Sequence, residues 1–139
     1  MASPTIPITI DPAAEANQLV DLFNGLSQTL DVFRLGDNIP PGTPADQLAR
    51  LKDEAQALED RAHYFTAQSI GATLQSIQGD LANIKSVTAQ AKNQLGVLND
   101  VSKVISIATS ALSLGTAIAA GNPASILAAT QALATTLTG

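Results

Sequence analysis

Few residues in this chain are suited to chemistry, and His63 is the first of them. It is the only histidine, and Asp60 precedes it by three positions. On a helix this spacing places a carboxylate and an imidazole on one face, as carboxylate-bridged di-iron bundles place their ligands. A di-iron centre needs a second such motif and further inward carboxylates, which one copy cannot supply. The sequence therefore predicts a surface or interhelical histidine, with no metal site and no cofactor.

A nucleophile that His63 could activate is equally hard to find. The chain contains no Gly-x-Ser-x-Gly elbow, and it has no cysteine for thiolate chemistry or for disulfides. The glycine-containing stretch 36–42 is not followed by Lys-Ser or Lys-Thr, so it is not a phosphate-binding loop. We therefore expect a protein that is not an enzyme and has no catalytic residues.

Charge is distributed unevenly along the chain. Seven Lys and Arg and twelve Asp and Glu give a net charge of -5, and all of these residues lie between Asp11 and Lys103. Nucleic-acid binding needs clustered basic residues to neutralise phosphates, so this acidic sequence predicts no nucleic-acid partner. Val104 to Gly139 contain neither a charge nor a histidine. We expect this end to be buried against the chain itself, a partner or a lipid.

The N-terminus predicts no cleavable signal peptide, because residues 1–10 lack a basic segment followed by an apolar run. These residues instead predict an extended arm in which Ile6, Ile8 and Ile10 alternate with proline or threonine. The compartment stays unknown: we expect a protein that is soluble by default, either cytoplasmic or exported by a route without a signal. The nearly uninterrupted apolar stretch 104–120 is at the short limit for crossing a bilayer.

Residues 11–139 predict a single all-α domain. Asp11 and Pro12 form an N-cap and a first helical residue, and leucines and phenylalanines then recur at helical spacing until Gly36. This pattern predicts a helix over 12–35. After the proline-rich connector, Thr43 and Pro44 begin a second helix, predicted over 44–95.

The 44–95 segment is predicted to be one long central helix of an elongated bundle. Its apolar stripe is expected to rotate near Gly71 by a bulge, a kink or a break, and we favour one long bent helix. Its apolar residues follow a heptad spacing typical of coiled-coil packing, with one five-residue step from Phe65 to Ile70 that rotates the stripe. Arg50 and Glu54 form an exposed pair four residues apart. The predicted helix-packing seam consists of Leu48, Leu51, Leu58, Phe65, Ile70, Leu74, Ile77, Leu81 and Ile84.

The C-terminal part predicts an uncharged helical hairpin. Asn99 or Asp100 can cap a helix over 100–120, and the Gly-Asn-Pro sequence at 121–123 forces a turn before a helix over 123–137. The apolar residues expected to contact a membrane or partner are Val104, Ile105, Ile107, Leu112, Leu114, Ile118, Ile126, Leu127, Leu133 and Leu137.

This layout of amphipathic helices followed by an uncharged hairpin with a Gly-Asn-Pro turn resembles that of α-helical pore-forming toxins of the cytolysin A kind. In those proteins a hydrophobic hairpin is masked until it meets a membrane. The resemblance is one of architecture, and this chain is much shorter. It implies a hairpin that is hidden in solution and exposed on contact.

Two functions follow from the sequence. The first is a non-enzymatic helical interaction protein whose hairpin, about residues 101–137, engages a membrane or a partner. The alternative is a self-associating structural or adaptor bundle in which the hairpin stays buried in the core. Both predict a homo-oligomer or a helical protein partner, and the first adds a lipid membrane.

Overall fold

A computed structural model describes residues 11–36, 39, 41–98 and 100–138. In these residues the chain is an all-α helical bundle without strands, as the sequence predicts. The predicted arm over residues 1–10 lies outside the described residues. The helices are α1 (Pro12–Leu35), α2 (Ala45–Tyr64), α3 (Ala67–Ser76), α4 (Leu81–Leu95), α5 (Val101–Ala120) and α6 (Pro123–Thr138).

Helix α1 covers the same residues as the helix predicted over 12–35. The Asp11 side chain accepts a hydrogen bond from the Ala13 N–H at 3.0 Å, which satisfies one of the unpaired amides of the first turn. At the other end the Gly36 N–H donates to the Phe33 carbonyl. The apolar stripe of α1 is buried, and its members are Leu19, Phe23, Leu26, Leu30 and Phe33.

The single long helix predicted over 44–95 is wrong, because the segment forms α2, α3 and α4. The first break is at Phe65, whose backbone is extended and whose ring packs edge-on against Phe23 with centroids 5.1 Å apart. A new helix then begins at Thr66, which forms a reciprocal capping box with Ser69. The apolar stripe therefore changes direction at the break at Phe65, and not at Gly71.

The second break lies between Ile77 and Asp80. The Asp80 N–H donates to the Ile77 carbonyl at 2.8 Å, which closes a turn that contains Gly79. Glycine costs about 1 kcal/mol relative to alanine inside a helix, so a turn is the favourable place for it. Because of the two breaks, the segment folds back on itself instead of forming one rod. The longest of the described helices is α1, with 24 residues.

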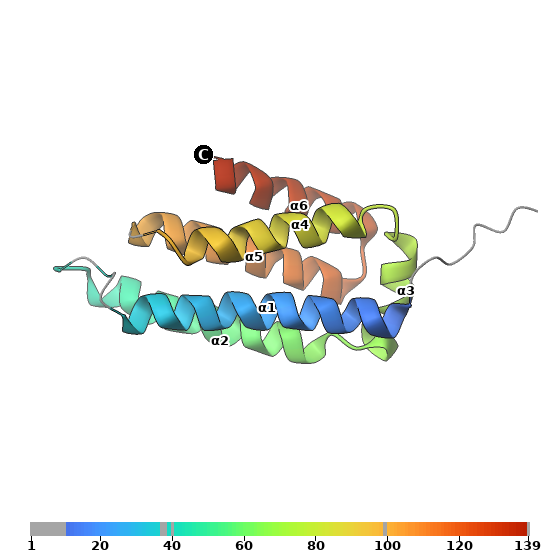
Figure 1. The fold of residues 1–139 in the computed structure, drawn as a ribbon, viewed down its shortest axis with the longest axis horizontal. Coiled ribbons are helices and arrows are strands. Elements are labelled where there is room, and N and C mark those ends of the chain that lie inside the picture. The colour runs from blue at the N-terminus through green and yellow to red at the C-terminus, as the bar shows by residue number, and fades with distance from the viewer. Residues whose placement is uncertain (1–10, 37–38, 40, 99, 139) are drawn as a thin grey trace, which may run out of the picture.

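The helices form two layers (Figure 1). Helices α1 and α2 lie side by side in one layer, α4, α5 and α6 form the other, and α3 joins them at one end. All acidic residues within helices belong to α1 and α2, whereas the charges of the second layer are Lys85, Lys92 and Lys103. The layer that contains the hairpin thus carries few charges.

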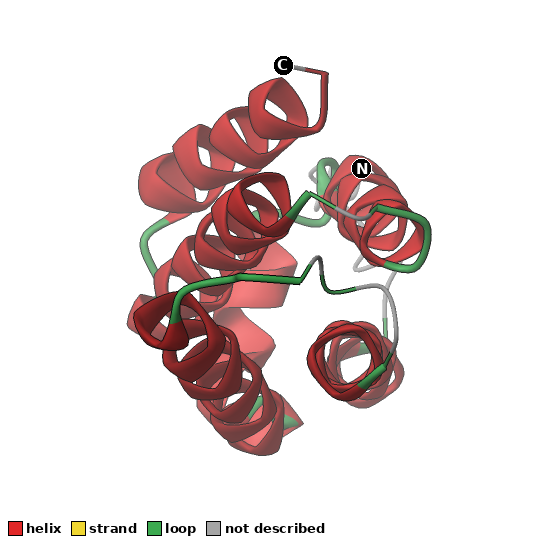
Figure 2. Cartoon of the chain, turned by 90° about the vertical axis from the view of Figure 1, so that its left-hand side faces the viewer, coloured by secondary structure: helices red, strands yellow, loops and turns green. Residues whose placement is uncertain are grey.

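Helix α5 is the central helix of the bundle. It packs against α1, α2, α3, α4 and α6, while α6 packs mainly on α5 and α4. Figure 2 shows the helices end-on, with the helix that leads to the C-terminus at the edge of the group. Helix α5 therefore lies at the centre of the bundle and α6 at its edge, although their compositions are similar: α5 has Lys103 as its one charged residue, and α6 has none.

The hairpin begins and turns at residues that the sequence indicates. Asp100 caps α5, and its Oδ1 accepts hydrogen bonds from the N–H groups of Ser102 at 3.0 Å and Lys103 at 3.4 Å. At the other end Gly121 adopts a left-handed conformation with φ 79°, which suits glycine because it has no Cβ. The Asn122 side chain then accepts from the Ser125 N–H at 3.3 Å.

We expect Asp100→Ala to lower the free energy of unfolding by about 1 kcal/mol, because two amides at the start of α5 lose their acceptor. Urea unfolding followed by circular dichroism measures the change. Asp80→Ala is the matched control, since Asp80 precedes α4 without capping it through its side chain. It should lower stability by no more than about 0.5 kcal/mol. Equal losses in the two variants would contradict the capping role of Asp100.

Candidate functional site

The apolar residues predicted for the hairpin lie mostly inside the bundle. Six are completely buried, two are nearly so, Leu112 is half-buried, and Leu127 is 38% exposed on α6. The six completely buried residues are Val104, Ile107, Leu114, Ile118, Ile126 and Leu133. A single chain therefore already covers most of the apolar surface that the sequence assigns to a membrane or partner.

The residues of the predicted packing seam converge on the same core. Eight of the nine are buried within the chain, although they are spread over α2, α3, α4 and the two breaks, where Phe65 and Ile77 lie, instead of one helix. Leu48 is the exception, with 37% of its surface exposed on α2. In this conformation the buried seam residues contact the chain's own helices, so they are not available to a second copy.

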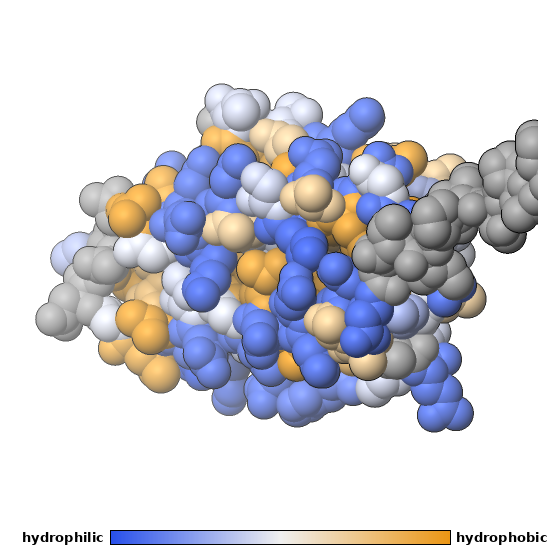
Figure 3. Space-filling view, turned by 45° about the vertical axis from the view of Figure 1, so that its right-hand side comes forward, coloured by the Kyte–Doolittle hydropathy of each residue, from blue (hydrophilic) through white to orange (hydrophobic). Residues whose placement is uncertain are grey.

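The outward face of the hairpin consists mostly of small residues without charge, with Leu127 and Gln131 as larger ones. Along α5 the exposed residues are Ser102, Ser106, Ser113, Thr116 and Ala120, and along α6 they include Ala124, Ala128, Gln131, Ala132 and Thr135. A hollow of about 510 Å³ lies between the two helices, with Leu112, Ala117 and Ala129 in its lining. Figure 3 shows one face of the molecule, on which hydrophilic residues predominate and hydrophobic patches lie between them.

The polar groups of the hairpin are satisfied largely within it. The hydroxyl of Ser106 donates to the Ser102 carbonyl at 3.0 Å, and Thr130 bonds to the carbonyl of the preceding turn in the same way. Near the open end, the Lys103 ammonium donates to the carbonyl of Thr136. The Ser110 and Thr136 hydroxyls are 3.0 Å apart. The contacts of Lys103 and Ser110 with Thr136 join α5 to α6 towards the end opposite the Gly121 turn.

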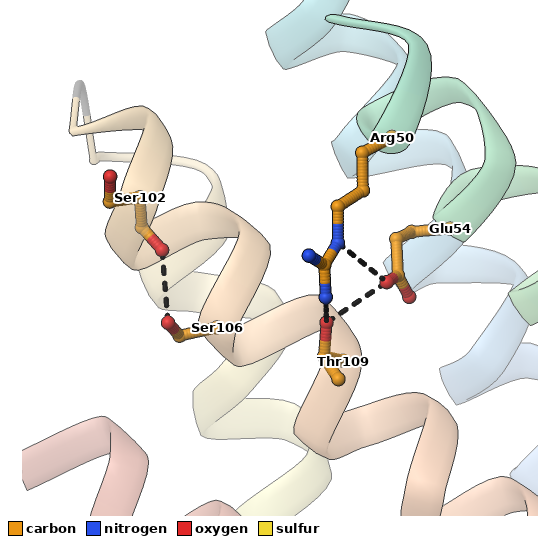
Figure 4. Close-up of polar contacts among 5 residues, drawn as sticks. All are labelled: Arg50, Glu54, Ser102, Ser106 and Thr109. Atoms are coloured by element: carbon orange, nitrogen blue, oxygen red, sulfur yellow. Dashed lines mark hydrogen bonds and ion pairs between the residues drawn. The ribbon is translucent and has the colours of Figure 1, made fainter. Parts of the chain in front are cut away.

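Thr109 makes a polar side-chain contact between α5 and α2 (Figure 4). Its hydroxyl donates to Oε1 of Glu54 at 2.9 Å, and a terminal nitrogen of Arg50 lies 3.4 Å from the same hydroxyl. The Arg50 Nε is 3.6 Å from Glu54 Oε1, while 57% of the arginine side chain is exposed. The sequence placed Glu54 on an exposed surface, and this is wrong: the residue is 8% exposed, because α5 covers it.

Sequence reasoning missed the contact between Glu54 and Thr109. Glu54 follows Leu51 by three positions and precedes Ala55 of the apolar stripe, so its place at the margin of the seam was the available signal. Which helix would cover that margin depends on the tertiary fold. No local pattern links positions 54 and 109.

The residues considered first for chemistry do not form a site in the described part of the chain. His63 is exposed near the end of α2, and Asp60 accepts a hydrogen bond from the Gln56 amide at 3.2 Å. Among residues 11–36, 39, 41–98 and 100–138, no three His, Cys, Asp or Glu side chains are grouped so that they could hold a metal ion. The candidate site is therefore the hairpin, with its contact to α2.

Comparison of the chain with protein-family models, with curated proteins and with solved structures finds no match. Among the described helices, α5 is long and apolar enough to cross a membrane by length and composition. The core helix of a soluble protein meets the same two criteria. The function proposed below therefore rests on the residues of this chain.

Proposed function

We propose that this chain is a non-enzymatic interaction protein whose α5–α6 hairpin transfers from the bundle into a lipid bilayer. The observation that carries the proposal is the composition of α5. Its 20 residues meet the length and hydropathy of a membrane-crossing helix, and its single charge, Lys103, lies near its start. A charge at a helix end reaches the interfacial region at little cost.

The internal hydrogen bonds of the hairpin support the same proposal. A helix can enter hydrocarbon only if its backbone and side-chain polar groups have partners. The hydroxyls of Ser106 and Thr130 bond to carbonyls of their own helices, and Ser110 contacts Thr136. The hairpin would carry these contacts with it.

The energetics allow such a transfer to be reversible. Burying apolar surface is worth about 25 cal/mol per Å² whether the new surroundings are protein or lipid. Moving the apolar surface of the hairpin from protein to lipid therefore changes the free energy little, because the burial lost in the bundle is replaced by burial in the bilayer. A lipid surface shifts the population by its differential affinity for the opened form.

Liposome flotation, combined with dye leakage and with the mass of the protein in solution, tests the proposal. Flotation with leakage is expected for a hairpin that inserts and perforates, in the manner of the pore-forming toxins that the layout resembles. Flotation without leakage would identify an anchor. Protein that stays with the buffer at every lipid composition would overturn the proposal.

Leu127→Asp is expected to reduce the amount of floated protein at least tenfold, because an aspartate inside a bilayer costs about 3 kcal/mol. Leu127 is 38% exposed on α6, so the bundle should lose about 1 kcal/mol or less. Leu48→Asp is a close control, with 37% exposure on α2 in the other layer. Equal flotation of both variants and the unchanged protein would show that α6 does not enter lipid.

A second function is supported by a different observation. Ten residues of α5 are buried, and five other helices surround it. A helix in this position also suits a structural or adaptor bundle that keeps its hairpin permanently in the core and associates with itself through other surfaces. A stable oligomer that ignores liposomes would favour this function.

A further inference from the structure

The contact between α2 and α5 contains a carboxylate that is only half satisfied. Glu54 Oε1 accepts from Thr109, but Oε2 is buried and has no hydrogen-bond partner in the described part of the chain. The neighbouring buried residues of α2 are apolar, namely Leu51, Ala55 and Leu58. An ionised oxygen without a partner in such surroundings disfavours the folded contact.

The arginine beside Glu54 compensates this charge weakly. Its Nε lies 3.6 Å from Oε1, beyond hydrogen-bond distance, and the side chain is 57% exposed. Water screens the attraction of so exposed a group. A second polar contact between the two layers joins α1 to α4, where the Lys85 ammonium lies 2.8 Å from Glu15 and 2.7 Å from the Gln18 amide oxygen. The polar contacts between α1 and α4 are therefore closer and better paired than those between α2 and α5.

We infer that Glu54 is a built-in limit on the stability of the α2–α5 contact, so that the bundle opens there first. The α5–α6 hairpin then parts from α2 as one unit, because the Gly121 turn joins the two helices at one end. The Lys103 and Ser110 contacts to Thr136 join them near the other end. This inference deepens the proposed function, since it names the contact that the hairpin releases, but its test needs no lipid.

Hydrogen exchange of the α5 amides in the full-length protein, together with urea unfolding, tests the inference. Glu54→Leu replaces the buried carboxylate by an apolar side chain of similar size. Replacement of buried charges by apolar groups is often neutral or stabilising. We expect the protected amides over residues 104–111 to exchange about tenfold more slowly. Faster exchange than in the unchanged protein would overturn the inference.

Thr109→Val gives the opposite expectation. It keeps the shape of the side chain and removes the hydroxyl that donates to Glu54, so the folding equilibrium constant should fall about tenfold or more. Combining Thr109→Val with Glu54→Leu should abolish that loss, because no carboxylate remains to be satisfied. A Thr109→Val loss of the same size in both backgrounds would overturn the inference.

Two further variants keep the test decisive. If Glu54→Leu does not fold, Glu54→Gln removes the charge and retains an oxygen for Thr109; slower exchange is again expected, and faster exchange overturns the inference. Asp53→Leu removes an acid from an exposed position next to Glu54. It should leave the exchange of the α5 amides unchanged. If Asp53→Leu slows exchange as much as Glu54→Leu does, the cause is net charge and not the buried carboxylate, and the inference is overturned. These measurements can succeed even if the protein ignores liposomes.

Discussion

Leu114→Asp should leave the chain without a stable folded state. Leu114 lies in the middle of α5 with none of its surface exposed. Removing the leucine side chain costs about 3 to 5 kcal/mol through lost burial and the resulting cavity, and a buried unpaired carboxylate adds several more. Domains of this size are stable by roughly 5 to 15 kcal/mol in total. The cooperative urea-unfolding transition should therefore be absent.

Ser113→Asp is the control for this substitution. It introduces the same charge one position earlier, on the exposed face of α5, where water solvates the carboxylate. Its free energy of unfolding should stay within about 0.5 kcal/mol of that of the unchanged protein. A cooperative transition in Leu114→Asp at the same urea concentration would show that α5 is not the core helix of the bundle in solution.

Phe23→Ala should cost about 3 to 5 kcal/mol, the second largest effect that we expect. The Phe23 side chain is completely buried, and its ring meets Phe65 edge-on at an interplanar angle of 87°. It also fills the space beside Gly115 of α5, where an added Cβ would come within 2.8 Å of the ring. One side chain thus holds α1, α5 and the break between α2 and α3 together.

Gly115→Ala tests this packing through a change of sign. With Phe23 present, the added methyl meets the ring and should destabilise the protein by about 1 to 3 kcal/mol. In the Phe23→Ala background the space is open, so the better helix propensity of alanine should make the same change favourable by up to about 1 kcal/mol. Urea unfolding of the four proteins measures both steps. The same sign in both backgrounds would show that Phe23 does not lie against Gly115.

Some helix boundaries were predictable from a local capping signal, although α2 begins at Ala45 with Pro44 as its N-cap, where the sequence predicted Thr43 as the cap. Asp11-Pro12 starts α1, and Gly121-Asn122-Pro123 turns the hairpin, because cap side chains and the preferences of glycine and proline act within a few residues. The start of α3 shows the limit of this rule. Its capping box uses Ser69 where the usual pattern has Glu or Gln, so the Thr66 signal was not read from the sequence.

The break at Phe65 has a long-range cause. The heptad spacing of the region satisfies a continuous helix as well as it satisfies three short ones. Contact of Phe65 with Phe23, 42 positions earlier, accompanies the extended backbone at that point. Sequence periodicity records which residues are apolar, but it does not record which partner each one meets.

By itself, the sequence determined that the protein is all-α, that its charges end at Lys103, and that a hairpin without charges beyond Lys103 turns at Gly121. Only the tertiary structure decided that α5 lies at the centre and α6 at the edge, and that Glu54 is covered by Thr109. The physical reason is that composition and capping act locally. Burial is a property of the whole packing, in which two helices of nearly the same composition occupy different positions.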